Sequence, residues 1–132
     1  MTMRKIAGLA GFLMLATLAG GTAALAGPEY GPLKMLKTSA GEVLTTPKGM
    51  TLYTYDKDTA GVSNCNGECA QYWPPLMAEK DAKPTGKLTL VTRSDGTMQW
   101  ADNGMPLYTF ANDKVSGDVT GDNKNSVWHV VK

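Results

Sequence analysis

One pattern of residues that could do chemistry occurs twice in this chain, with two aromatic residues and an aspartate in the spacing Y-x-[FWY]-x-x-D. The two copies consist of Tyr53, Tyr55 and Asp58, and of Tyr108, Phe110 and Asp113. Residues two apart on a strand share one face, so each copy presents two rings together and an aspartate just past the strand end. Such clusters could bind a ligand. Recurrence in both copies favours an architectural interpretation, in which the rings build a core and the aspartate accepts backbone N–H groups of the next loop.

The only two cysteines, Cys65 and Cys69, form a second candidate site. In an exported protein an even pair of cysteines predicts a disulfide. The loop that it closes is short, so the chain-entropy estimate of its stabilisation is only about 2 kcal/mol. The spacing is C-x-x-x-C rather than the C-x-x-C of redox helices, and no adjacent base is evident. A structural disulfide is therefore favoured over redox activity or metal binding.

Two sets of residues could ligate a metal. Calcium prefers hard oxygen ligands, and Asp113, Asp118 and Asp122 crowd one loop, although their spacing does not match an EF-hand and no glutamate closes the loop. Thioether sulfur suits Cu(I), so methionines together with His129 are a further possibility, but the methionines are dispersed and fit better as core filler. The alternatives are a solvated loop with Asx turns and a structural histidine. A metal-binding protein is thus the second functional hypothesis, and no cofactor is predicted.

An enzyme is disfavoured by what the chain lacks. Nucleophilic catalysis needs a nucleophile held by a base, and the single histidine, His129, stands inside the valine-rich final segment. A hydrolase using paired carboxylates needs a larger cleft than so small a domain is expected to provide. The preferred hypothesis is an exported, non-enzymatic binding or interaction module, whose ligand, a protein or a small molecule, is unassigned.

The elements that position these residues also occur twice, because positions 33–76 align with 88–131 at a constant offset of 55. A repeat of this size predicts two copies of one β unit that bury their faces together. Apolar alternation and turn residues predict strands over 33–38, 42–46 and 50–55, and over 87–93, 97–100, 105–110 and 127–131. One helical turn is expected at 68–72, and Pro74 and Pro75 favour an edge-like extended stretch after it. The predicted fold is all-β: two antiparallel meanders, repeats 33–77 and 88–132, joined by a linker 78–87 and packed as a small sandwich or barrel.

The N-terminus predicts export. Arg4 and Lys5 precede an apolar run, and Ala24-Leu25-Ala26 is an A-x-A cleavage site, so residues 1–26 are interpreted as a signal peptide and 27–132 as a single domain. No cysteine stands at the lipid-acceptor position, so no lipid anchor is expected. After cleavage 11 Lys and Arg residues remain against 12 Asp and Glu, a formal charge of −1. This balance argues against nucleic acid as a partner, and a periplasmic or secreted location is predicted.

Taken together, the two motifs, the cysteine stretch 65–75 ending in Trp-Pro-Pro, and the closing segment 127–131 resemble a bacterial family of secreted repeats, the lipoproteins with the Yx(FWY)xxD motif. The resemblance covers nearly all of the chain after residue 26. It implies an exported, two-repeat, mostly β protein. The family has no assigned function, so no functional residue carries over from it.

Overall fold

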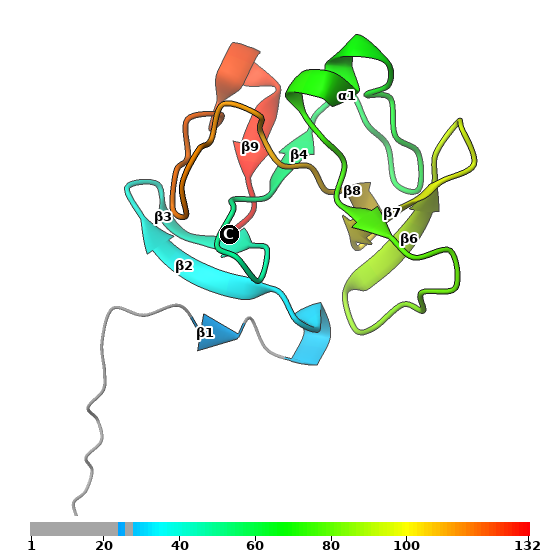
Figure 1. The fold of residues 1–132 in the computed structure, drawn as a ribbon, viewed down its shortest axis with the longest axis horizontal. Helices are drawn as coiled ribbons and strands as arrows, with labels where there is room; N and C mark the ends of the chain where they lie inside the picture. Colours follow the sequence, from blue (N-terminus) through cyan, green and yellow to red (C-terminus); the bar gives the residue numbers. More distant parts are fainter. Residues whose placement is uncertain (1–23, 26–27) are drawn as a thin grey trace, which may run out of the picture.

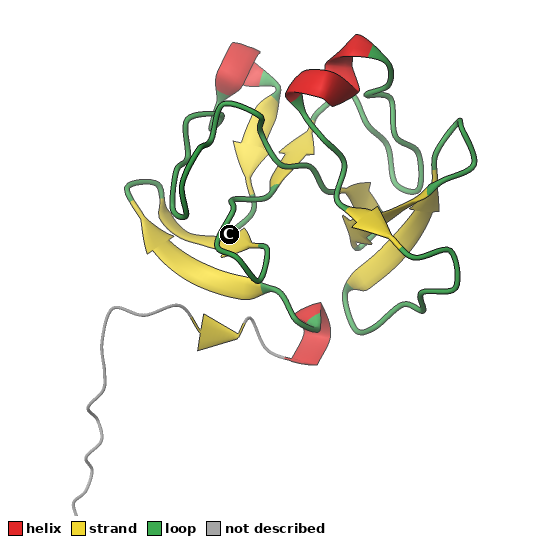
Figure 2. Cartoon of the chain, in the orientation of Figure 1, coloured by secondary structure: helices red, strands yellow, loops and turns green. Residues whose placement is uncertain are grey.

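The computed structural model describes residues 24–25 and 28–132, and the chain is all-β, as predicted (Figures 1 and 2). Besides the predicted helical turn it contains the short 3-10 turns η2 (Pro28–Tyr30) and η3 (Lys124–Ser126). Most of the predicted signal peptide and its cleavage junction lie outside the described residues. None of the helices in the described part has the length and apolar character that a membrane crossing needs. In chain order the elements are β1 (Ala24–Leu25), η2 (Pro28–Tyr30), β2 (Lys34–Thr38), β3 (Gly41–Thr45), β4 (Tyr53–Tyr55), α1 (Glu68–Tyr72), β5 (Met77–Ala78), β6 (Leu88–Thr92), β7 (Met98–Asp102), β8 (Met105–Pro106), η3 (Lys124–Ser126) and β9 (Trp128–Val130).

Each repeat begins with an antiparallel hairpin, β2–β3 in the first and β6–β7 in the second. Most strands overlap the predicted stretches, but 50–55 is regular only at β4, and β1 and β5 are not among the predicted strands. Helix α1 occupies the predicted helical turn 68–72. The stretch predicted as a strand over 105–110 is regular only at β8, because Pro106 and the crossing described below interrupt the ladder. All paired strands are antiparallel, in three sheets that do not close into a barrel within the described residues. β5 pairs with β7, so the predicted linker begins inside a strand.

The two hairpins differ in register by one residue. Met35 pairs with Leu44 in the first repeat, whereas the equivalent residue Leu90 pairs with Trp100. The turn between β6 and β7 is longer by one residue, and the tight turn at Asn103 and Gly104, both with positive φ, removes the extra residue again. The constant offset inferred from the sequence is therefore wrong within β7, where Gln99 takes the place that Val43 has in β3. A shift of one residue reverses the face that each side chain occupies, and this is how a polar residue enters the core.

The closing segments of the two repeats are exchanged. In the first repeat, three backbone hydrogen bonds form a triangle: Leu44 N donates to Val131 O (2.7 Å), Val131 N to Leu52 O (3.3 Å), and Leu52 N to Leu44 O (3.0 Å). Val131, the third residue of this triangle, belongs to the end of the second repeat. The equivalent triangle joins Trp100 and Leu107 to Leu76, from the end of the first repeat, over distances of 2.8–3.0 Å. Strand β9 likewise pairs with β4 of the other repeat. Neither repeat thus completes its own backbone hydrogen bonds.

Two apolar clusters flank two central extended segments, 52–55 and 107–110. Leu52 and Leu107 point into one cluster and Tyr53 and Tyr108 into the other, and all four are fully buried. Alternation along an extended chain sends neighbours to opposite faces, so these two segments are covered on both sides. The leucine-rich cluster contains Leu33, Leu44, Leu52, Leu88, Leu107 and Val131. The aromatic cluster contains Tyr53, Cys65, Trp73, Tyr108, Phe110 and Trp128.

Candidate functional site

The tyrosine and aspartate side chains of the two motifs hydrogen-bond to each other rather than within one motif. Tyr53 Oη donates to Asp113 Oδ2 over 2.7 Å, and Tyr108 Oη donates to Asp58 Oδ2 over 2.7 Å. The backbones of the two tyrosines also exchange hydrogen bonds, Tyr53 N to Tyr108 O at 2.8 Å and Tyr108 N to Tyr53 O at 3.0 Å. The tyrosine of each repeat therefore meets the aspartate of the other repeat. We refer to these two contacts as the crossed Tyr–Asp pairs.

Each aspartate of the crossed pairs also holds the loop that follows it. Asp58 Oδ1 accepts from Asn64 N at 2.6 Å, and Asp113 Oδ1 accepts from both the backbone N and the hydroxyl of Thr120. Burial raises the pKa of Asp58, against the lowering effects of the Asn64 N–H, the Tyr108 hydroxyl and the positive charge of Arg93. Burial also raises the pKa of Tyr53 and of Tyr108, and the neighbouring aspartates add to this effect. Both phenols consequently stay protonated, and remain hydrogen-bond donors, at neutral pH.

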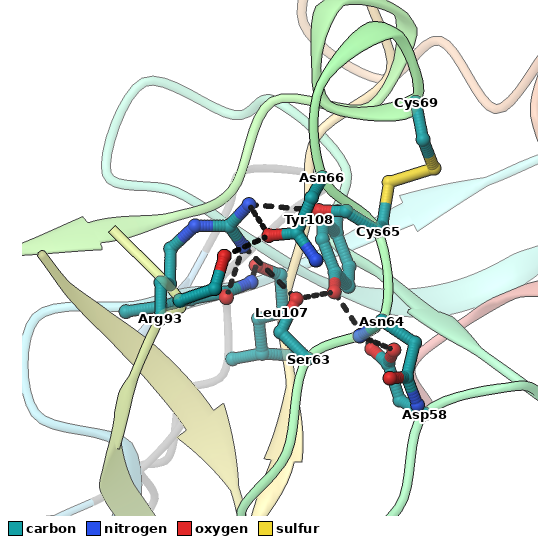
Figure 3. The surroundings of a disulfide bond; sticks show 11 residues. Asp58, Ser63, Asn64, Cys65, Asn66, Cys69, Arg93, Leu107 and Tyr108 are labelled. Atoms are coloured by element: carbon teal, nitrogen blue, oxygen red, sulfur yellow. Dashed lines mark hydrogen bonds between the residues drawn. A yellow bond between two sulfur atoms is a disulfide. The ribbon is translucent and has the colours of Figure 1, made fainter. Parts of the chain in front are cut away.

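The Tyr108–Asp58 pair is extended by a buried arginine, Arg93, which Figure 3 shows beside the disulfide loop. Arg93, 7 % exposed, donates through Nη1 to Ser63 Oγ (3.0 Å) and Gln99 Oε1 (2.8 Å), and through Nη2 to the carbonyl of Cys65 (2.7 Å). A guanidinium can only donate, so Ser63 Oγ accepts a hydrogen bond from Arg93. Because the Tyr108 hydroxyl donates to Asp58, the Ser63 hydroxyl donates its own hydrogen bond to Tyr108 Oη, 2.6 Å away. The result is a polar chain that runs from the Arg93 cation to the Asp58 carboxylate and fixes residues 63–66 onto the second repeat.

Arg93 and Gln99 stand where the first repeat has Thr38 and Val43, which gives a direct test of this network. We expect Arg93→Thr to lower the free energy of unfolding by roughly 2–4 kcal/mol, because several buried acceptors lose a charged donor. The double variant Arg93→Thr/Gln99→Val should lose less than the single variant, since the orphaned amide oxygen is also removed. Urea unfolding measures both effects. A loss from Arg93→Thr no larger than that from an exposed lysine substitution would contradict this reading of the arginine.

The disulfide itself joins Cys65 to Cys69, as predicted, and closes the turn into α1. Cys65 is fully buried in the aromatic cluster, while Cys69 on α1 packs against its edge. The bond thereby fixes α1 over the aromatic rings.

Four aromatic rings in and beside the aromatic cluster are stacked face to face, in the order Phe110, Trp73, Trp128, Tyr55. Ring centroids are 4.0 Å apart for Phe110 and Trp73, 3.8 Å for Trp73 and Trp128, and 4.2 Å for Trp128 and Tyr55. The sequence equivalents Trp73 and Trp128 lie in the centre, so the approximate twofold axis between the repeats passes between them. The core tyrosines meet this stack edge-on, Tyr53 against Trp73 and Tyr108 against Trp128.

A hollow of about 410 Å³ opens at one side of this aromatic stack, between α1 and η3. Figure 1 shows these two short helices at the same end of the molecule, near β4 and β9. We call the hollow the aromatic groove. It lies off the twofold axis, on the side of Phe110 rather than Tyr55. Its lining residues are Cys69, Tyr72, Trp73, Phe110, Asn112, Lys124, Asn125 and Trp128.

The η3 wall of the aromatic groove is held in an unusual backbone conformation. Asn123, Asn125 and Ser126 all have φ between 51° and 62°, a region that non-glycine residues rarely adopt. Behind them, Gly121 lies so close to the rings that an added Cβ would approach Trp73 to 2.7 Å and Phe110 to 2.9 Å. Strained residues of this kind persist only where the surrounding structure determines them, and they cluster at ligand-binding sites.

The residues proposed from the sequence as metal ligands are occupied by other contacts. Asp113 belongs to a crossed pair, Asp118 accepts from the backbone N–H groups of Lys114 and Val115, and Asp122 accepts from Val130 N. Within residues 24–25 and 28–132, no three His, Cys, Asp or Glu side chains are grouped so that they could hold an ion. His129 is half-exposed and its Nε2 lies 2.9 Å from Asp56 Oδ2. The metal hypothesis thus gains no support from the arrangement of these side chains.

Sequence reasoning singled out the two motifs and the cysteine pair, but it did not find the aromatic groove. None of its polar lining residues, Asn112, Lys124 and Asn125, was a candidate site residue in the sequence analysis. One signal was available: at the constant offset, Cys69 aligns with Lys124 and Trp73 with Trp128, so the α1 segment and the η3 segment occupy equivalent places in the two repeats.

A comparison with family models matches residues 34–77 and 89–132, in two copies, to the family described as a secreted repeat of unknown function. The chain belongs to this family. The family match fixes the two-repeat organisation and the export of such proteins, and leaves their function open. No curated protein and no solved structure matches the chain.

Proposed function

We propose that this secreted repeat is a non-enzymatic binding module, in which the crossed Tyr–Asp pairs are architectural and the aromatic groove receives the ligand. The four residues of the crossed pairs have their polar groups engaged inside the fold: Tyr53 and Tyr108 are completely buried, and Asp58 and Asp113 are 4 % and 6 % exposed. Polar groups that are buried and hydrogen-bonded in this way hold a fold together and leave no donor or acceptor for a ligand.

The observation that carries the proposal is the groove itself. A volume of about 410 Å³ falls in the range of small-molecule sites, and its lining combines four aromatic rings with a few polar groups at the rim. The rigid ring stack and the disulfide-anchored α1 form walls that exist before any ligand arrives, which lowers the cost of binding.

The proposal is tested by screening a library of small molecules of mixed charge against the protein, using the indole N–H signals of Trp73 and Trp128 in NMR spectra as reporters. We expect binders that shift these two signals. Asn112→Phe, which narrows the rim, should weaken them about tenfold or more, a change of about 1.4 kcal/mol. Lys57→Phe is the matched control, because Lys57 is the exposed sequence equivalent of Asn112 in the first repeat and lies outside the groove. A library with no binder at these signals would contradict the assignment.

A further inference from the structure

The aromatic groove is positively charged, in addition to lying off the twofold axis. Lys124 is the one charged residue among those that line it. The two ion pairs within the described residues join Lys87 to Glu29 and His129 to Asp56, so no carboxylate there neutralises the Lys124 ammonium group. Its Nζ lies 5.9 Å from the centroid of the Phe110 ring, which places the positive charge over the aromatic lining of the groove.

The neighbouring acidic residue does not cancel this charge. Asp122, two residues before Lys124, is turned to the backbone of β9, where its Oδ1 accepts from Val130 N at 3.1 Å. The other polar groups at the groove, the side-chain amides of Asn112 and Asn125 and the hydroxyl of Tyr72, are neutral and can donate hydrogen bonds. The groove therefore offers one cation and several donors beside the edges of the stacked rings, and no anionic group of its own.

We infer that the ligand of the aromatic groove is a small planar aromatic acid, whose ring lies against the exposed Tyr72 side chain and the edges of the stacked Trp73 and Phe110 rings, and whose carboxylate pairs with Lys124. This inference rests on the proposed function and adds the ligand class to it. Edge-to-face contacts with the aromatic stack favour a flat ring. A carboxylate at the rim forms charge-assisted hydrogen bonds, which are stronger than those of a neutral amide in the same place.

Three probes of similar size separate the parts of this inference: naphthoate, its neutral counterpart naphthamide, and its saturated counterpart decahydronaphthalene-carboxylate. Isothermal titration should give naphthoate an affinity about tenfold higher than that of naphthamide and of decahydronaphthalene-carboxylate. Lys124→Met removes the charge and keeps the aliphatic stem of an exposed side chain, so the fold should be unaffected. This variant should bind naphthoate and naphthamide equally. Lys37→Met, an exposed lysine on β2, is the control and should leave the preference for naphthoate unchanged.

Different failures point to different errors. Equal binding of naphthoate and naphthamide to the parent protein, with shifts at Trp73 and Trp128, would overturn the ligand class and leave the binding function in place. A preference for naphthoate that survives in Lys124→Met would also overturn it. If none of the three probes shifts the two indole signals while other members of the mixed library do, the inference fails and the proposed function stands. If nothing in that library binds at these signals, both fail.

Discussion

Replacing Trp128 with alanine is expected to lower the free energy of unfolding by about 3–5 kcal/mol, as for other fully packed aromatic residues. Trp128 is 3 % exposed and contacts three rings: it stacks on Trp73 at 3.8 Å and on Tyr55 at 4.2 Å, and receives the edge of Tyr108 at 5.2 Å. Its removal opens a cavity at the approximate twofold axis. The walls of this cavity come from both repeats, and they cannot close it without breaking the crossed Tyr–Asp pairs. Urea unfolding followed by circular dichroism measures the loss.

Trp100→Ala is the control for this prediction, because it makes the same truncation outside the aromatic stack. Trp100 is half-buried beside the leucine-rich cluster, and we expect its loss to cost less than half as much. Equal losses at Trp100 and Trp128 would show that the stack has no special role in joining the repeats.

The second large effect is expected at alkaline pH. Tyr53 and Tyr108 have an ordinary pKa near 10, and burial raises the folded-state pKa of both well above that value. Above about pH 10 the unfolded chain releases these two protons while the folded protein retains them, so stability is fully present below this pH and falls as the pH rises. The linkage slope is about 1.4 kcal/mol per pH unit for each proton, or about 2.7 kcal/mol per pH unit for the two tyrosines. Burial also raises the pKa of half-buried Tyr30, to about 12, which adds in the same direction.

The alkaline effect is measured by urea unfolding at a series of pH values, with tyrosinate absorbance reporting ionisation. Tyr108→Phe should reduce the slope by about 1.4 kcal/mol per pH unit, because one of the protons is no longer released. Tyr72, 56 % exposed, is the matched control, and Tyr72→Phe should leave the slope unchanged. A slope that is the same in all three proteins would mean that the buried phenols do not determine alkaline stability.

Much of the fold could be predicted from the sequence because the information is local. Alternating apolar residues, Gly-containing turns and the Asn103-Gly104 pair specify the hairpins, and the cysteine spacing specifies the disulfide. The aromatic faces of the motifs also follow from strand periodicity, since Tyr53 and Tyr55 point to one side and Leu52 to the other.

The hydrogen-bond partners of these residues could not be predicted from the sequence in the same way. Nothing in the spacing of Tyr53 and Asp58 indicates that each bonds to the other repeat, because an internal repeat predicts two similar units and does not say which unit completes which. The exchange of Leu76 and Val131 between the two backbone triangles is invisible for the same reason. Arg93 at the end of a predicted strand has the pattern of a surface charge, and only the one-residue shift in β7 gives it a buried partner in Gln99.

The proposed binding function depends on differences between the two repeats. Equivalent positions carry Tyr55 and Phe110, and Lys57 and Asn112, and only the second member of each of these pairs lines the groove. Duplication supplied a symmetric frame whose interior both repeats need. Substitutions on one side could then build a binding site without disturbing the crossed pairs.

The central claim is that the motifs lock one repeat to the other, and a double-mutant cycle tests it most directly. The cycle compares Tyr53→Phe with Asp113→Asn, the bonded pair from different repeats, and Tyr53→Phe with Asp58→Asn, the pair within one motif. Contacting residues show interaction energies of about 0.5–3 kcal/mol, whereas residues without a shared contact are nearly additive. We predict a coupling of about 1 kcal/mol or more for Tyr53 with Asp113 and a clearly smaller one for Tyr53 with Asp58. Coupling confined to the pair within one motif would show that each repeat satisfies its own motif, and would contradict the account.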